Sequence, residues 1–253
     1  PAYFPKVPSF CGRLCRLLRK SKPFAYDSFG ILHSEIVTRY CTIDRRGLPR
    51  WEREFLEIVV TFQPSLPAVA ARCRSYRRFY EEEKIPAEAL RELVDLARMT
   101  ASTANSQALK FRICSTDEEN ERVFGTLKWA GALPDWDGPV KGERPSAYLI
   151  LLCDLALGKN KLQDDGITAQ TIMLGAVEMG YGGCMLGNVE RKRLAELLDI
   201  DTAKYSIDLV LALGKPKEKV VVVPVGADGD VRYYRDADQV HYVPKRSLDE
   251  IIL

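Results

Sequence analysis

The sequence contains few of the residues that build metal sites and nucleophilic triads. Only two histidines, His33 and His241, occur in its 253 residues. A metal site built on histidine, or a serine–histidine–aspartate triad, is therefore not expected. No CxxC pair accompanies Cys11 and Cys15, so we expect neither a four-ligand zinc site nor an iron–sulfur cluster.

The sequence also lacks a strong excess of charge and a long apolar run. A net charge of +2 argues against a nucleic-acid partner, because such binding relies on a basic surface that neutralises phosphates. No uninterrupted apolar run approaches the ~20 residues that cross a bilayer, so we expect no membrane partner. Seven cysteines, an odd number without regular spacing, are more typical of reduced thiols in a cytoplasmic protein than of a disulfide framework.

The N-terminal quarter of the chain differs in character from the rest. It shows no clean periodicity, and six cations but no acidic residue precede Asp27. Such a stretch is either a targeting or membrane-surface segment or, more commonly, a flexible extension or sequence upstream of the true start. Pro64 and Pro67 mark a boundary. We therefore expect an N-terminal extension over residues 1–65 and a folded domain over residues 66–253.

From about Leu66 onward, helical patterns alternate with short apolar segments. Apolar residues recur at helical spacing after Pro86, and Thr116 with Glu119 has the pattern of a capping box. Besides the helix after Pro86, the sequence predicts helices over residues 116–127, 163–179 and 190–198. It predicts strands over residues 111–114, 147–153, 184–186 and 207–213. This alternation predicts a layered α/β or α+β domain.

Two segments of this domain carry further signals. In the helix predicted over 163–179, residues at three- and four-residue steps share one face: Ile167, Gln170, Thr171, Leu174 and Val177. Gly175 indicates a close approach of another element, and glycines from Gly180 onward end the helix. Residues 129–146 follow no period and predict a long loop, in which Trp129 and Trp136 either stack near a substrate or pack against a partner subunit.

Two polar segments have the chemistry of a site for a phosphorylated aromatic cofactor. The basic run Arg74–Phe79 offers guanidinium groups and a hydroxyl, which bind phosphate. The loop Ala104–Gln107 offers side-chain amides, which donate to and accept from the edge of a heterocycle.

With three further segments, the sequence resembles the FMN-dependent nitroreductase family over about residues 68–253. The resemblance rests on five segments in order: Arg74–Phe79, Thr100–Gln107, Asp165–Gln170, Gly180–Cys184 and Leu211–Pro216. It implies an α+β, three-layer fold with a central, mostly antiparallel sheet flanked by helices. It also implies a homodimer with FMN at the subunit interface. The implied activity passes reducing equivalents from NAD(P)H to a small-molecule acceptor, a nitroaromatic or quinone, by a ping-pong mechanism.

The same resemblance implies the site residues. Arg74, Ser75 and Arg77 would hold the FMN phosphate and ribityl chain, and Asn105 and Gln107 would contact the ring or the ribityl hydroxyls. Leu186 and Gly187 lie where family members present a backbone N–H to flavin N5. Lys245 and Arg246 resemble a tail whose cations reach the phosphate. No side chain is expected to act as acid, base or nucleophile, because the flavin supplies the chemistry.

The chain departs from the family pattern at Cys73, where many members have arginine. Arg72 could compensate, or Lys245 and Arg246 could carry more of the phosphate charge. After Gln107, the family often has Pro-Trp where this chain has Ala108-Leu109, a smaller surface.

Several residues keep a plain structural interpretation beside the functional one. Arg78 could pair with the acidic residues Glu81–Glu83. Gln170 could bridge helices or touch a ligand. Cys153 and Cys184 are interpreted as small buried side chains. Other flavin chemistry on the same scaffold (dehalogenation, enoyl reduction, flavin fragmentation) and a non-catalytic flavin-binding protein stay open as alternatives.

Overall fold

The computed structural model describes residues 65–133, 135–157 and 163–253. The predicted N-terminal extension therefore lies outside the described residues, apart from Ser65. The helices, including one 3-10 turn (η2), are α4 (Leu66–Arg72), α5 (Ala87–Arg98), η2 (Thr103–Asn105), α6 (Asp117–Phe124), α7 (Asp164–Glu178), α8 (Arg191–Leu197) and α9 (Leu248–Ile251). The strands are β1 (Phe79–Tyr80), β2 (Leu109–Cys114), β3 (Ala147–Asp154), β4 (Gly182–Leu186), β5 (Tyr205–Pro216), β6 (Val220–Pro224), β7 (Tyr234–Arg235) and β8 (His241–Lys245).

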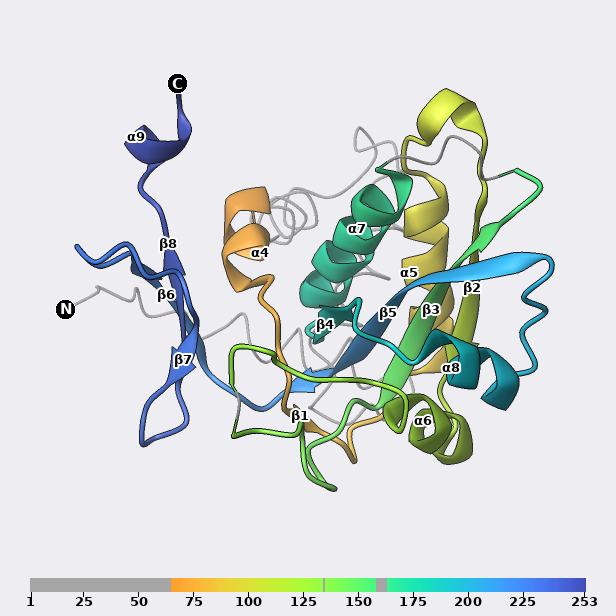
Figure 1. The fold of residues 1–253 in the computed structure, drawn as a ribbon, viewed down its shortest axis with the longest axis horizontal. Coiled ribbons are helices and arrows are strands. Elements are labelled where there is room, and N and C mark those ends of the chain that lie inside the picture. The colour runs from red at the N-terminus through yellow and green to blue at the C-terminus, as the bar shows by residue number, and fades with distance from the viewer. Residues whose placement is uncertain (1–64, 134, 158–162) are drawn as a thin grey trace, which may run out of the picture. The chain divides into compact units, whose positions relative to one another are not determined.

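A five-stranded sheet forms the centre of the described domain (Figure 1). Its strand order is β1-β5-β3-β2, and β4 also pairs with β5. Every pairing between these strands is antiparallel. The long strand β5 therefore pairs with three strands, β1, β3 and β4. Strand β4 pairs with Val210–Gly214 of β5, and β1 pairs with Lys215 and Pro216. The α+β class and the mostly antiparallel sheet predicted from the sequence are confirmed.

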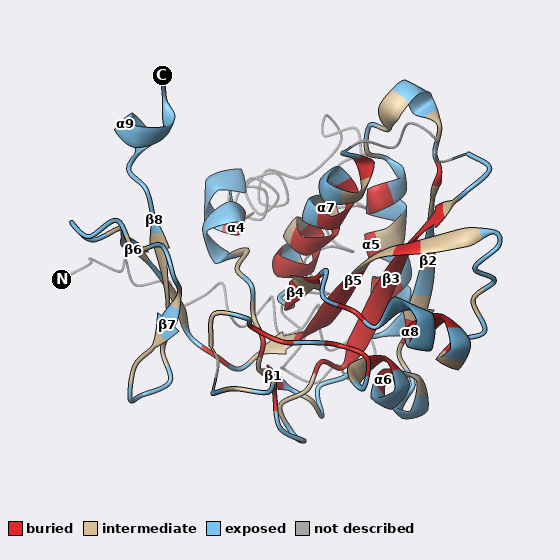
Figure 2. Cartoon of the chain, viewed as in Figure 1, coloured by how far each residue is buried: buried red, intermediate tan, exposed pale blue. Residues whose placement is uncertain are grey.

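Helices cover both faces of this sheet, so the domain has three layers. Side chains of α5 and α7 pack with Leu149, Leu151 and Leu211 on one face. Side chains of α6 and α8 pack with Ile150 and Val210 on the other. Figure 2 shows the buried residues gathered along β3, β5 and the inner side of α7. Strand β3 is buried on both faces, as its continuous apolar run predicts.

Helix α7 was predicted with nearly correct ends, but the five residues predicted to share one face differ in burial, since Val177 is buried. Gln170 is exposed and Ile167 is 43% exposed, whereas Thr168, Ala169 and Ile172 are buried. Because α7 carries apolar residues almost all round, periodicity alone does not select the inner face. The close approach predicted at Gly175 is confirmed, since a Cβ there would lie 2.7 Å from Leu96 Cδ2 of α5.

Thr116 is the N-cap of α6, because its hydroxyl accepts a hydrogen bond from the Glu119 backbone N–H at 3.2 Å. This is one of the two hydrogen bonds of the predicted capping box. Helix α6 nevertheless ends at Phe124, earlier than predicted, with Gly125 as its C-cap. The interpretation of Cys153 and Cys184 as buried side chains is confirmed, since they are 2% and 3% exposed.

The C-terminal segment forms a second sheet that the sequence analysis did not predict. Strand β6 pairs in parallel with β8, and β7 pairs antiparallel with β8. Figure 1 shows β6, β7, β8 and α9 as an arm that stands apart from α7 and the central sheet. We call residues 217–253 the C-terminal arm. None of the helices in the described ranges has the length and apolarity needed to span a membrane.

Candidate functional site

The basic run that follows α4 lies against β4. Ser75 forms a parallel bridge with Gly183, and the Tyr76 backbone N–H donates to the Gly183 carbonyl at 2.9 Å. The Tyr76 hydroxyl donates to the Arg72 carbonyl at 2.9 Å. Gly183 is required at this position, because a Cβ would lie 2.3 Å from the Ala212 carbonyl oxygen. Two of the predicted motifs are therefore joined through their backbones.

Arg74 is half-buried and keeps an unused donor. Its Nη2 donates to the Ala70 carbonyl at 2.8 Å, and its Nε is buried without a hydrogen-bond partner among the described residues. A buried guanidinium N–H without a partner costs free energy, so an acceptor such as a phosphate oxygen fits beside it. Ser75 is exposed and supplies a second donor next to it.

Arg77 is enclosed by the C-terminal arm and is only 8% exposed. Its backbone N–H donates to the Glu218 carboxylate, and its Nη1 lies 3.4 Å from Nε2 of His241. Its guanidinium also lies over the Tyr233 ring, 4.8 Å from the centroid. The structure therefore gives Arg77 partners within its own chain, and its role toward FMN stays a prediction.

The loop that carries Asn105 and Gln107 has an unusual backbone. Ala104, Asn105 and Gln107 have φ values of 51°, 53° and 50°, in the left-handed region that residues other than glycine rarely adopt. Both amide side chains are exposed, and the nearby Ser106 Oγ is buried without a partner among the described residues. Such backbone strain persists where surrounding contacts hold it and is common at binding sites.

Helix α7 links this loop to the basic run. Asp164, which is 2% exposed, accepts hydrogen bonds from the Thr103 backbone N–H at 2.9 Å and from its hydroxyl at 2.7 Å. Two turns along, Gln170 Nε2 lies 3.5 Å from Cys73 Sγ. Gln170 thus bridges α7 to the segment beside Arg74, the structural alternative foreseen for it. One rigid helix contacts both ends of the predicted cofactor site.

Leu186 and Gly187 lie at the end of β4. Leu186 is buried and Gly187 is exposed. Arg191 Nη2 donates to the Gly187 carbonyl at 3.1 Å, which fixes the peptide that follows the strand. In the C-terminal arm, Lys245 and Arg246 are exposed, and Arg246 lies 3.5 Å from Glu250. Lys245 is the last residue of β8 and Arg246 follows it, so both lie in the C-terminal arm.

The prediction that Arg78 pairs with Glu81–Glu83 is wrong. Arg78 Nε and Nη2 donate to the two carboxylate oxygens of Glu143 at 2.5 and 2.8 Å, and Lys217 Nζ lies 3.0 Å from the same group. The Arg78 hydrogen bond is the largest cause that lowers the pKa of Glu143 to about 2. The loop brings Glu143 back across β1, a contact that proximity in sequence does not reveal.

Both tryptophans of the 129–146 loop pack within the chain. Trp129 is 7% exposed and lies 6.0 Å from the Phe124 ring, measured between ring centroids. The Trp136 ring lies under the Arg235 guanidinium, 4.2 Å from its centroid. Neither of the two roles considered from the sequence describes these contacts.

The sequence analysis missed a buried polar cluster where the arm meets the domain. Arg235 pairs with Glu218 at 3.0 Å, and both lie against Arg77 or its backbone. Burial, together with Arg77 and Arg235, lowers the pKa of His241 to about 4. His241 is therefore neutral near pH 7. The signal in the sequence was a histidine placed between Val240 and Tyr242.

Comparison with known proteins places these features in a wider context. Residues 70–144 and 157–215 match the model of the "Nitroreductase family". The chain is similar to a solved structure from Staphylococcus epidermidis ATCC 12228 that is named a putative NAD(P)H:FMN oxidoreductase, with 19% identity, a TM-score of 0.53, and coverage of 73% of this chain and 93% of that chain. No curated protein matches the sequence.

Two further solved structures have the same fold. An FMN-dependent nitroreductase from Clostridium difficile R20291 shares 19% identity, covers 61% of this chain and 89% of that one, and has a TM-score of 0.50. The second is CLA-ER, named as an enone reductase of a gut-bacterial fatty acid saturation metabolism. It shares 17% identity with a TM-score of 0.51, and the match covers 61% of this chain and 90% of that one. At these identities the likeness concerns the fold.

Proposed function

The chain belongs to the nitroreductase family, and from this premise we propose that it is an FMN-dependent NAD(P)H oxidoreductase. The proposed acceptor is a small electron-poor molecule, a nitroaromatic or a quinone, reduced in a ping-pong cycle. When bound, FMN would supply the redox chemistry by accepting a hydride from NAD(P)H and passing reducing equivalents to the acceptor. The chain's residues would bind and orient this group.

The observation that carries the proposal is the gathering of Arg74, Ser75 and the Asn105 loop around α7. The buried Arg74 Nε and Ser106 Oγ are without partners among the described residues, which suits a ligand with phosphate and hydroxyl groups. We assign the phosphate to Arg74 and Ser75, and the ring edge to Asn105 and Gln107. Backbone donors at Leu186 and Gly187 would stabilise negative charge on the reduced ring.

We also propose that the working unit is a homodimer. Exposed apolar side chains support this, because a single chain leaves them in water: Leu66, Met99, Ile167, Leu248, Ile251 and Ile252. In a dimer, the exposed Lys245 and Arg246 of one arm could reach the phosphate held by the partner. A monomer in light scattering that still binds FMN would contradict this part of the proposal. The cytoplasmic location expected from the cysteine usage stays a prediction.

The proposal is tested on purified protein by its visible absorption spectrum. We expect a flavin spectrum, as purified or after FMN is added, and bleaching by NADH or NADPH in the absence of oxygen. Turnover with a nitroaromatic, a quinone and an enone then identifies the acceptor class. A colourless protein that leaves the spectrum of added FMN unperturbed would show that the proposal is wrong. FMN binding without NAD(P)H oxidation would favour the non-catalytic alternative.

A further inference from the structure

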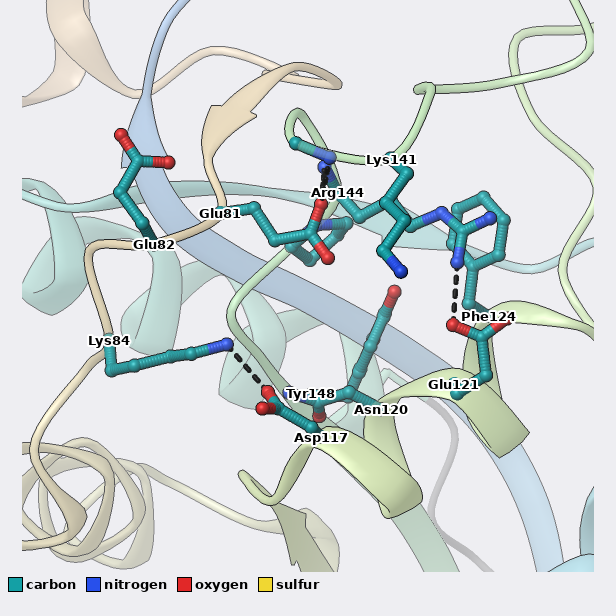
Figure 3. A pocket seen from close by; sticks show the side chains of 12 residues that line it. Glu81, Glu82, Lys84, Asp117, Asn120, Glu121, Phe124, Lys141, Arg144 and Tyr148 are labelled. Carbon is teal, nitrogen blue, oxygen red and sulfur yellow. Dashed lines mark hydrogen bonds and ion pairs between the residues drawn. The ribbon is translucent and has the colours of Figure 1, made fainter.

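A pocket of about 410 Å³ lies between the turn that follows β1, α6, the loop before β3, and β3 itself. This volume is in the range of small-molecule sites. None of the residues assigned to FMN lines it. Figure 3 shows side chains from all four segments around it, with the Tyr148 hydroxyl directed toward the middle of the pocket.

The floor of the pocket holds two buried polar side chains with unused hydrogen-bonding atoms. Tyr148 is 1% exposed, and its hydroxyl has no partner among the described residues. Asn120 is 8% exposed, and its Nδ2 donates to the Ser146 carbonyl at 2.8 Å, which fixes the orientation of the amide. Its Oδ1 is buried and also unpaired within the part of the chain that the structure describes. Buried polar atoms nearly always have a partner, either water or a bound molecule, so these two atoms can bind a polar ligand.

The unused atoms of the floor call for a hydrogen-bond donor. Asn120 Oδ1 can only accept, and a tyrosine hydroxyl can accept as well as donate. Burial raises the pKa of Tyr148 well above its usual value, so the hydroxyl keeps its proton. Four carboxylates and three cations line the pocket. The unpaired acceptor at Asn120 and the excess of one carboxylate in the lining together favour a positively charged hydrogen-bond donor.

Most charges on the walls are already paired. Lys84 lies 2.7 Å from Asp117, and Arg144 lies 2.6 Å from Glu121. Glu81 accepts hydrogen bonds from the backbone N–H groups of Gly142 and Arg144. These contacts hold the walls in place and leave little charge for a ligand.

One lining cation, Lys141, is exposed and has no ion pair among the residues that the structure describes. It comes from the loop that closes one side of the pocket (Figure 3). An ammonium group at this position suits a carboxylate at the outer end of a ligand. The pocket thus combines acceptors at its floor with an exposed cation at its rim.

We propose that this pocket binds a small zwitterion of the amino-acid class, with its cationic end at Tyr148 and Asn120 and its carboxylate at Lys141. The proposal does not depend on FMN binding. The four lining carboxylates outnumber the three lining cations by one, so the lining has a small negative charge around the cationic end. The Phe124 ring is covered by the Arg144 guanidinium, 4.0 Å from its centroid, and closes the apolar side.

Calorimetric titration of the protein as purified tests the proposal with three probes. Arginine carries a guanidinium, an ammonium and a carboxylate, agmatine lacks only the carboxylate, and glutarate carries only carboxylates. We expect arginine to bind most tightly, agmatine about tenfold more weakly, and glutarate not to bind. Binding of glutarate in preference to agmatine would overturn the assignment of the floor. Failure of all three to bind would leave only a water-filled hollow and would overturn the proposal.

Two variants test the two ends separately. Lys141→Ala should lower arginine affinity about tenfold and leave agmatine unchanged, because only arginine has the carboxylate. Tyr148→Phe should weaken both about tenfold, since it removes one hydroxyl and no other atom. Thermal unfolding checks that the variants fold, and Lys192→Ala, an exposed residue of α8, is the matched control for Lys141→Ala. Equal arginine affinity of Lys141→Ala and the wild type would refute the carboxylate contact.

Discussion

The carboxylate of Asp164 holds Thr103 by both its backbone N–H and its hydroxyl, at 2.9 and 2.7 Å. Asp164 is buried at the start of α7, and Thr103 begins the turn that carries Asn105. A hydrogen bond to a charged group contributes more than a neutral one, about 1.5–3 kcal/mol. This contact therefore holds the left-handed backbone of the candidate ring-binding loop in place.

Replacing Asp164 by asparagine should loosen that loop. The amide side chain would have one acceptor oxygen and no charge, so we expect a loss of about 1–3 kcal/mol in the free energy of unfolding and weaker FMN binding. Urea unfolding and FMN titration measure the two effects. Asp165→Asn is the matched control, because Asp165 accepts only from the neighbouring Gly166 N–H, at 2.8 Å, among the described residues. Wild-type FMN affinity in Asp164→Asn would show that the loop does not need this contact.

The Gly183→Ala substitution should destabilise the domain. Its Cβ would lie 2.3 Å from the Ala212 carbonyl oxygen and 2.8 Å from Leu213 Cδ2, so β4 would have to move from β5. Overpacking of this kind costs about 1–3 kcal/mol or more. Thermal unfolding measures it. The control is Gly187→Ala, where the nearest atom lies 4.0 Å away and the melting temperature should not change.

Arg74→Ala should weaken FMN binding by about 1.5–3 kcal/mol, the contribution of a charged hydrogen bond, with little change in stability. Fluorescence titration of FMN measures the affinity. Arg91→Ala is a suitable control, since Arg91 is an exposed arginine of α5. If Arg74→Ala binds FMN as tightly as the wild type, the phosphate lies elsewhere.

His241 should make stability depend on pH. Its folded pKa of about 4 lies below the usual value of 6.5, so the unfolded chain takes up a proton first as the pH falls. Stability should therefore decrease between about pH 6.5 and 4, by up to about 3 kcal/mol. Urea unfolding at several pH values measures this slope.

The His241→Phe variant should have a shallower slope in the same pH range. Glu143 does not affect this slope above about pH 4.5. Its pKa is 4.5 in the unfolded chain and about 2 in the folded one, so it changes stability only between these two pH values. Equal slopes in the variant and the wild type would mean that the pKa of His241 is the same in the folded and the unfolded chain.

The central sheet could be predicted because its strands are continuous apolar runs, as in β3, which only a doubly covered strand accommodates. The C-terminal arm could not, because β6 and β8 are half-exposed and pair in parallel although β7 lies between them in the sequence. The partner of Arg78 depends on a loop that folds back over β1, and spacing along the chain does not encode it. The sequence also showed no sign of the Tyr148 hydroxyl as a binding group, because Tyr148 stands in the apolar run that forms β3.

The sequence predicted that Arg74 and the loop of Asn105 belong to one cofactor site, and this assignment stays a prediction. It did not predict that Arg77 would be enclosed by Glu218 and His241, because these residues come from the unpredicted arm. The motif therefore predicted the guanidinium of Arg77 but not the residues of the arm that contact it.

The bridge between Ser75 and Gly183 has a consequence for how the protein folds. It closes a loop that contains α5, β2, α6, β3 and α7, and closing a long loop costs entropy that local contacts do not repay. Contacts so distant in sequence slow folding. We therefore expect the basic run to reach its position late in folding, so a molecule that binds there would recognise the chain after most of the sheet has formed.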